Sequence, residues 1–234
     1  MSEPRIYFVH WVCKPGTVEL PDEELAGAMI IVHLIGNDIR DAIEKSKQIA
    51  IDSGWIPEPI PYMYSLHFQD EMEFIGEEYI LEGMQRVIED GPWISIVWFS
   101  QDDELYDIER SKYIWLLDWE AENVSDERAD GIVDAHAHMA VFLRCEGLAE
   151  AVDEGYDWIS SMGWIPDDEP SWAEQLCYSD IDDRVHPQYQ FAALEAFRDG
   201  HSMYFQMFAQ ADGYPDRVFP LCYSDDEDEE FAQS

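Results

Sequence analysis

Basic residues are scarce in this chain. Lysine and arginine account for 13 of its 234 residues, against 52 aspartates and glutamates, so the formal net charge is −39. Nucleic acids and anionic membranes are bound through lysine and arginine that neutralise phosphate, and a surface of this charge repels both. We therefore expect neither nucleic acid nor a membrane as a partner.

Cysteine spacings typical of disulfide frameworks or zinc sites are also missing. The four cysteines are isolated from one another and form no CxxC pair: Cys13, Cys145, Cys177 and Cys222. This favours free thiols in a reducing compartment. No basic start followed by an apolar run marks a signal peptide, and no stretch approaches the ~18 apolar residues of a spanning helix. We expect a cytoplasmic protein.

Common catalytic motifs are absent too. The chain has no GxSxG, no glycine-rich phosphate loop and no HExxH. Carboxylate pairs occur throughout the sequence, so no single pair indicates glycosidase-type catalysis. We predict that the protein is not an enzyme and needs no cofactor. An enzyme of unknown type is kept as the weakest of the alternatives.

One string resembles an enzyme motif. Residues 131–138, GIVDAHAH, resemble the metal-binding HxH of amidohydrolases, in which two histidines on one side of a strand bind a metal that activates water. That family folds as an α/β barrel of at least ~200 residues and takes further ligands from downstream. The resemblance also implies a lysine downstream of the HxH, but the last lysine here is Lys112. Only about a hundred residues follow His138, fewer than the rest of such a barrel needs. We predict no metal at His136 and His138.

What the chain does contain is an internal repeat. Gly54-Trp55-Ile56-Pro57 recurs 109 residues later as Gly163-Trp164-Ile165-Pro166. The same ungapped register matches Val32 with Val141, Leu34 with Leu143, Ala42 with Ala151, Pro61 with Pro170, Asp90-Gly91 with Asp199-Gly200, Phe99 with Phe208 and Gln101 with Gln210. We predict two tandem copies, residues 1–108 and 109–222, and an acidic C-terminal tail, 223–234.

Each copy has the same predicted order of elements, ββαβαβ. Strands are predicted at 5–12, 28–35, 62–68 and 93–99, and at 113–119, 138–144, 172–178 and 202–208, from their β-branched and aromatic residues. Helices are predicted from apolar residues at helical spacing over 39–53 and 80–88, and over 148–162 and 189–197. The order favours an α+β sandwich of ferredoxin-like character, with both helices of a copy on one face of its sheet.

The GWIP sequence is predicted to end the first helix of each copy. Gly54 and Gly163 can adopt the left-handed conformation that follows a last helical turn, and the proline three residues later prevents continuation. A tryptophan–proline surface for ligands is the alternative interpretation. Gly91 and Gly200 are predicted to end the second helices in the same way.

Acidic clusters beside an aromatic residue are the remaining candidate site. They lie in the link between the copies (Asp102, Asp103, Glu104) and around the third strand of the second copy (Asp167, Asp168, Glu169, Trp172, Asp180, Asp182, Asp183). Such carboxylates can steer and hold a basic protein while the aromatic ring anchors it. Solvated loops without a partner are the alternative.

The charge and these clusters lead to a functional hypothesis. The protein would bind and neutralise a basic, nucleic-acid-acting protein, in the manner of bacterial immunity proteins. A nucleic-acid mimic that blocks a restriction, CRISPR or other DNA-binding protein is the first alternative. A halophilic surface would also explain the charge, but nine tryptophans and a single threonine, Thr17, fit it poorly.

Overall fold

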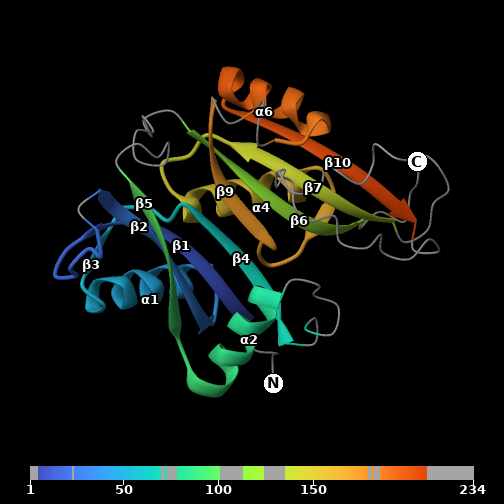
Figure 1. Ribbon diagram of the computed structural model, residues 1–234. Coiled ribbons are helices and arrows are strands. Elements are labelled where there is room, and N and C mark those ends of the chain that lie inside the picture. Colours follow the sequence, from blue (N-terminus) through green and yellow to red (C-terminus); the bar gives the residue numbers. More distant parts are fainter. Residues whose placement is uncertain are drawn as a thin grey trace, which may run out of the picture.

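The protein is a mixed α/β structure built on one large antiparallel sheet (Figure 1). The computed structural model describes residues 5–22, 24–69, 72, 78–100, 113–123, 135–178, 181 and 185–209. The first copy contains β1 (Arg5–Pro15), β2 (Leu25–Gly36), α1 (Ile39–Asp52), β3 (Trp55–Pro57), β4 (Met63–Phe68), α2 (Glu78–Asp90) and β5 (Trp93–Ser100). The second contains β6 (Tyr113–Asn123), β7 (Ala135–Leu143), α4 (Leu148–Ser161), β8 (Trp164–Pro166), β9 (Trp172–Cys177), α6 (Pro187–Asp199) and β10 (His201–Ala209).

The predicted strands and helices are present in both copies, with one addition. Trp55–Pro57 and Trp164–Pro166, predicted only as helix stops, form the short strands β3 and β8, which pair with β1 and β6. The predicted boundary near residue 108 and the acidic tail lie outside the described residues, so the domain limits stay predictions. None of the described helices has the length and apolarity of a membrane span.

The sheet has the same strand order when it is read from either end. Its order is β10-β7-β6-β9-β4-β1-β2-β5, in which each strand of one copy mirrors its counterpart in the other. The copies join where β4 pairs with β9, with Met63 opposite Glu174, Tyr64 opposite Ala173 and Ser65 opposite Trp172. Tyr64 and Ala173 are separated by the repeat length of 109, so a local two-fold axis passes through this pair.

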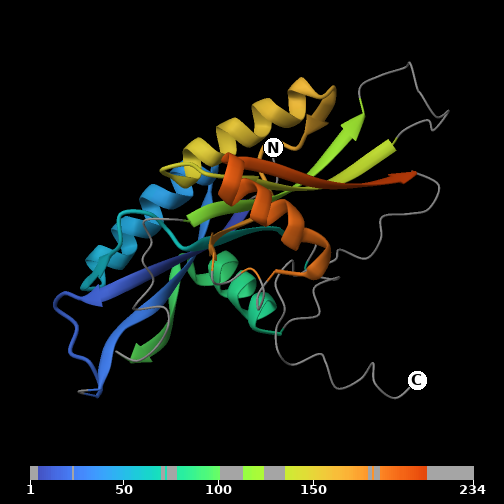
Figure 2. The same cartoon turned by 90° about the horizontal axis from the view of Figure 1, so that it is seen from above.

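The helices cover both faces of the sheet, which corrects the one-face prediction and the ferredoxin-like character. The cluster on one face joins α1 and α4 to strand residues such as Val9, while α2 packs on Ile6 and Phe8, which point the opposite way along β1. In the second copy α6 packs on Ile114 on that same opposite face. Figure 2 shows α1 and α4 on one side of the sheet and α2 and α6 on the other.

Continuous apolar runs explain this arrangement. β1 is buried on both faces from Ile6 to Val9, which is typical of a strand covered on each side by helices. A strand with one solvated face alternates apolar and polar residues instead. The opening strand of each copy therefore already indicated two covered faces.

The predicted glycine stops are confirmed by backbone conformation. Gly54, Gly91, Gly163 and Gly200 have φ values of 88°, 89°, 86° and 94°. Residues with a side chain rarely adopt a positive φ, because the Cβ atom then crowds the backbone. Each glycine thus ends its helix and turns the chain into the following strand.

The two GWIP glycines are expected to differ in their tolerance of a side chain. A Cβ on Gly54 would lie 2.5 Å from Thr17 Oγ1 and 3.0 Å from Val18 Cγ2, whereas no described atom lies within 4 Å of a Cβ on Gly163. We expect Gly163→Val to lower the free energy of unfolding by about 1–2 kcal/mol through backbone strain alone. Gly54→Val should lower it further because steric overlap is added, and urea denaturation measures both. Equal losses would contradict the difference in packing.

Candidate partner-binding surface

Of the ten predicted partner-binding residues, six lie outside the described residues, two are exposed and two are buried. Asp102, Asp103, Glu104, Asp180, Asp182 and Asp183 lie outside the described residues. Asp167 and Asp168 are exposed in the loop between β8 and β9. Glu169 and Trp172 are each only 9% exposed, so the structure places them inside the protein and not on a docking surface.

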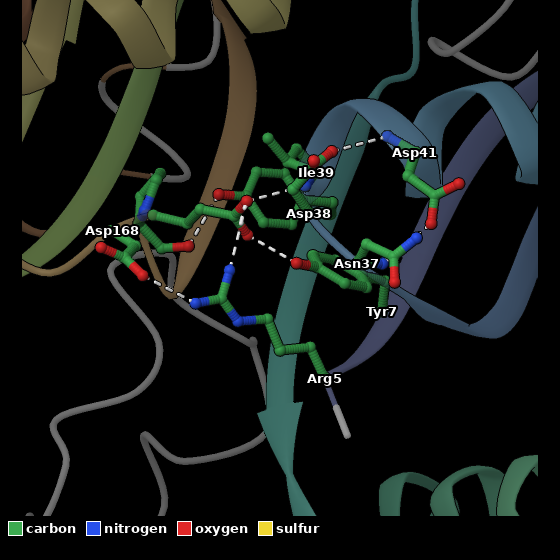
Figure 3. A network of polar contacts seen from close by, with 10 residues as sticks. Arg5, Tyr7, Asn37, Asp38, Ile39, Asp41 and Asp168 are labelled. Atoms are coloured by element: carbon green, nitrogen blue, oxygen red, sulfur yellow. Dashed lines mark hydrogen bonds and ion pairs between the residues drawn. The ribbon is translucent and has the colours of Figure 1, made fainter. Parts of the chain in front are cut away.

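Glu169 of the second copy contacts Arg5, Tyr7 and Ile39 of the first copy, and Figure 3 shows these three residues of the network. The Tyr7 hydroxyl donates to its Oε2 at 2.5 Å, and the backbone N–H of Ile39 donates to its Oε1 at 2.8 Å. Ile39 is the first residue of α1, where free N–H groups and the helix dipole favour a negative charge. Burial and the Glu169 carboxylate raise the pKa of Tyr7, which keeps its hydroxyl protonated as a donor.

Arg5 adds ion pairs at the edge of this contact between the copies. We call the contact, formed by Arg5, Tyr7, Ile39, Asp168 and Glu169, the joint. Its guanidinium contacts Asp168 at 2.9 Å and Glu169 at 3.6 Å. The Asp168 side chain is 82% exposed, so this part of the network faces water. Two of the residues expected to hold a partner, Asp168 and Glu169, therefore hold the first copy to the second.

Trp172 is buried for a separate reason. It belongs to the cluster that α6 forms with the sheet, together with Ile114, Leu116 and Phe142. An aromatic residue in this position stabilises the second copy's own core. It cannot anchor a partner on the surface of the protein as folded.

The joint has no counterpart on the other side of the two-fold axis. Ile60 stands at the repeat position of Glu169. Trp115 matches Tyr7, because the opening strands align at an offset of 108: Tyr7 pairs with Leu34, and Trp115 pairs with its repeat counterpart Leu143. Trp115 is fully buried, and its Nε1 has no hydrogen-bond partner among the described residues. An acidic and a phenolic residue that both lack repeat counterparts were the sequence signal for this joint.

His138 is engaged by a strand neighbour. Its Nε2 lies 2.7 Å from Asp118 Oδ1, and the Ser171 hydroxyl donates to Asp118 Oδ2 at 3.0 Å. Burial lowers the pKa of His138, but the hydrogen bond and charge of Asp118 outweigh this and raise it. The Ser171 hydroxyl therefore donates to Asp118 and not to His138, unlike the serine–histidine pair of a serine nucleophile.

No metal-binding group emerges from the part of the chain that the structure describes. There, no three His, Cys, Asp or Glu side chains are arranged to hold an ion. The His136 side chain lies outside the described set, so the absence of a metal at His136 and His138 stays a prediction.

An acidic ridge runs along the exposed face of α4. We define it as Glu150, Asp153, Glu154 and Asp157, which are all exposed. Their spacing of i, i+3, i+4 and i+7 places the four carboxylates on one side of the helix, over about 10 Å. The opposite side of α4 is buried on the sheet through Leu148, Ala151, Val152, Gly155 and Ile159.

The ridge is specific to the second copy. The matching positions on α1 are Asp41, Glu44, Lys45 and Gln48, and Lys45 forms an ion pair with Asp41. On the ridge, Asp153 is paired with Arg40 of α1. The helical spacing of the four acids was the signal that would have singled out α4 in the sequence.

An aromatic hollow lies beside the ridge. It has a volume of about 1300 Å³, and its lining includes Tyr113, Cys145, Glu146, Tyr178, Phe191 and Phe197. Tyr178 and Phe191 are 65% and 70% exposed. Two arginines also line it and are engaged locally, since Arg198 pairs with Asp199 and Arg144 donates to the Phe197 carbonyl.

Two hydrogen bonds connect the hollow to the ridge. The backbone N–H of Glu146 donates to Glu150 Oε2 at 2.9 Å, and Cys145 Sγ donates to Glu154 Oε2 at 3.4 Å. Burial and nearby carboxylates raise the pKa of Cys145 to about 12, so it is a thiol and not a nucleophilic thiolate at neutral pH. Two ridge carboxylates thus contact one wall of the hollow, at Cys145 and Glu146, and exposed aromatic rings form other parts of its lining.

Comparison of the chain with protein-family models, with curated proteins and with solved structures gave no match.

Proposed function

We propose that this protein binds and neutralises a basic protein, with the acidic ridge of α4 and the adjoining aromatic hollow as the contact surface. One observation carries the proposal: two of the four ridge carboxylates, Glu150 and Glu154, accept hydrogen bonds from residues that line the hollow. Carboxylates accelerate the encounter with a basic partner, and buried aromatic contacts supply most of the binding energy. The net charge of −39 supports the same partner chemistry.

An immunity-type inhibitor of a nucleic-acid-acting protein is the form of this function that we favour. Such an inhibitor needs one complementary patch, whereas a nucleic-acid mimic needs carboxylates repeated along an extended surface. The ridge spans about 10 Å, and the matching face of α1 is interrupted by Lys45. Nucleic acid should displace a mimic in proportion to the partner's affinity for it, while an inhibitor that covers a different surface resists this competition.

Neutralising the ridge should abolish partner binding. We expect a basic protein to co-purify with the wild-type chain from its native host, and to be lost with the triple variant Glu150→Gln, Glu154→Gln and Asp157→Asn. A matched control changes three other exposed acids by the same charge: Glu44→Gln, Asp52→Asn and Glu89→Gln. Quantitative mass spectrometry of the eluates measures the partner in each case.

Two results would contradict the proposal. One is an acidic protein as the specific partner. The other is equal loss of the partner in both triple variants, which would show that total charge matters and the ridge does not.

A further inference from the structure

The strand β5 forms one end of the sheet, and its pairing with β2 is regular from Gly27 to His33, with a register shift between Leu25 and Gly27. Among the described strands its one neighbour is β2, and its eight residues, WISIVWFS, include no charge and no proline. Ile96, Val97 and Trp98 are 44%, 53% and 37% exposed. Soluble proteins normally protect such an edge with lysine, proline, a bulge or a covering segment, because its free N–H and C=O groups attract further strands. In a chain with a net charge of −39, this edge strand has no charged residue.

Contacts at the two ends of β5 hold it in place. Trp93 stacks on His33 with ring centroids 4.4 Å apart, and the Arg86 guanidinium lies 4.7 Å from the centre of the same indole. The ring centroids of Trp98 and Trp55 are 5.5 Å apart. Between these contacts, about four of the eight residues of β5 direct their backbone N–H and C=O groups away from β2.

Acidic residues flank both ends of this edge. Glu89 and Asp90 end α2, two residues before β5. Asp22 and Glu24 precede β2, and the pairing of Leu25 with Ser100 brings this acidic segment to the other end of β5. The one base on α2, Arg86, is paired with Glu82. A second copy added antiparallel through β5 would bring acidic ends together, which repel. A segment with basic residues at both ends complements this edge.

We propose that β5 is a docking edge for an extended segment of the basic partner, which adds to the sheet as a further strand. Backbone hydrogen bonds would supply affinity, and Ile96 and Val97 would select apolar side chains at the centre of the segment. The inference rests on the proposed function, from which it takes the partner's basic character. It adds a second contact, on the first copy, to the ridge and hollow on the second.

A pair of peptides tests the docking edge. The first has lysines at both ends of an alternating valine–threonine core, and the second is identical except that alternate core amides are N-methylated, which removes donors without changing charge. We expect the wild-type protein to bind the first peptide at least about tenfold more tightly, by calorimetry. Hydrogen exchange of the β5 amides should slow only with the first peptide.

Variants of the protein supply the matched control. Val97→Lys places a charge on the edge and should weaken binding of the first peptide about tenfold or more. Ile165→Lys adds the same charge at a residue of β8 that is 51% exposed, and should change the affinity less than twofold. The N-methylated peptide should bind all three proteins with similar, weak affinity.

The outcomes separate this inference from the proposed function. Equal affinity for both peptides would overturn the docking edge and leave electrostatic binding intact. Binding of neither peptide would overturn the edge and count against a basic partner as well. Sedimentation that shows a dimer of the wild-type chain, dissociated by Val97→Lys, would assign the edge to a second copy and overturn our assignment.

Discussion

Replacing Glu169 with alanine should lower the free energy of unfolding by about 3–5 kcal/mol, because it breaks a buried charged network by removing one side of it. The Tyr7 hydroxyl and the Ile39 N–H would lose their acceptor inside the protein, and a buried donor without an acceptor is costly. Arg5 would lose its partly buried carboxylate neighbour and keep its exposed contact with Asp168. Urea denaturation measures the loss.

The neighbouring carboxylate is the control for this prediction. Asp168→Ala removes an ion pair whose aspartate is 82% exposed, and we expect a loss below about 1 kcal/mol. The loss of unfolding free energy for Glu169→Gln should lie between the losses for Glu169→Ala and Asp168→Ala, since the amide keeps one acceptor oxygen but loses the charge. If Glu169→Ala and Asp168→Ala were equally mild, the carboxylate would not be what holds the copies together.

Binding of the basic partner should be fast and strongly dependent on salt. Between about 50 and 500 mM salt the Debye length falls from about 14 to about 4 Å, so the association rate should fall steeply while dissociation changes less. The triple reversal Glu150→Lys, Glu154→Lys and Asp157→Lys should slow association on the order of 100-fold at low salt. Stopped-flow or surface plasmon resonance measurements with the co-purified partner give both rates.

The aromatic hollow should mainly affect the dissociation rate constant. Phe191→Ala removes an aromatic ring that is 70% exposed and should mainly speed dissociation, because the ring contributes contact area and no charge. Association that is indifferent to salt, or a ridge reversal without effect on its rate, would refute the electrostatic mechanism. The charge of −39 would then reflect solubility or habitat.

The strands, helices and helix ends could be predicted because their causes are local. Apolar spacing over about two turns defines a helix such as α1, and positive φ at Gly54 follows from its place after the last turn. The repeat reinforced each assignment by showing it twice. The short strands β3 and β8 were missed because pairing with β1 and β6 creates them, and three residues carry no periodic signal of their own.

The burial of Glu169 and Trp172 could not be predicted from the sequence. The use of acidic residues beside aromatic rings for partner binding stays a prediction, and we now place it on α4 and in the hollow. A run such as Asp167-Asp168-Glu169 gives no indication that its third residue turns inward. That depends on Tyr7, 162 residues earlier in the chain, and on the start of α1.

The sequence by itself determined the repeat, the order of elements and the charge, because each depends on residue types at short or fixed separations. The tertiary structure alone decided that helices cover both faces of the sheet and that the copies join through β4 and β9. It also decided which carboxylates are buried and which face solvent. These features depend on contacts between residues far apart in the chain, where the free energy of burial and pairing exceeds any local preference.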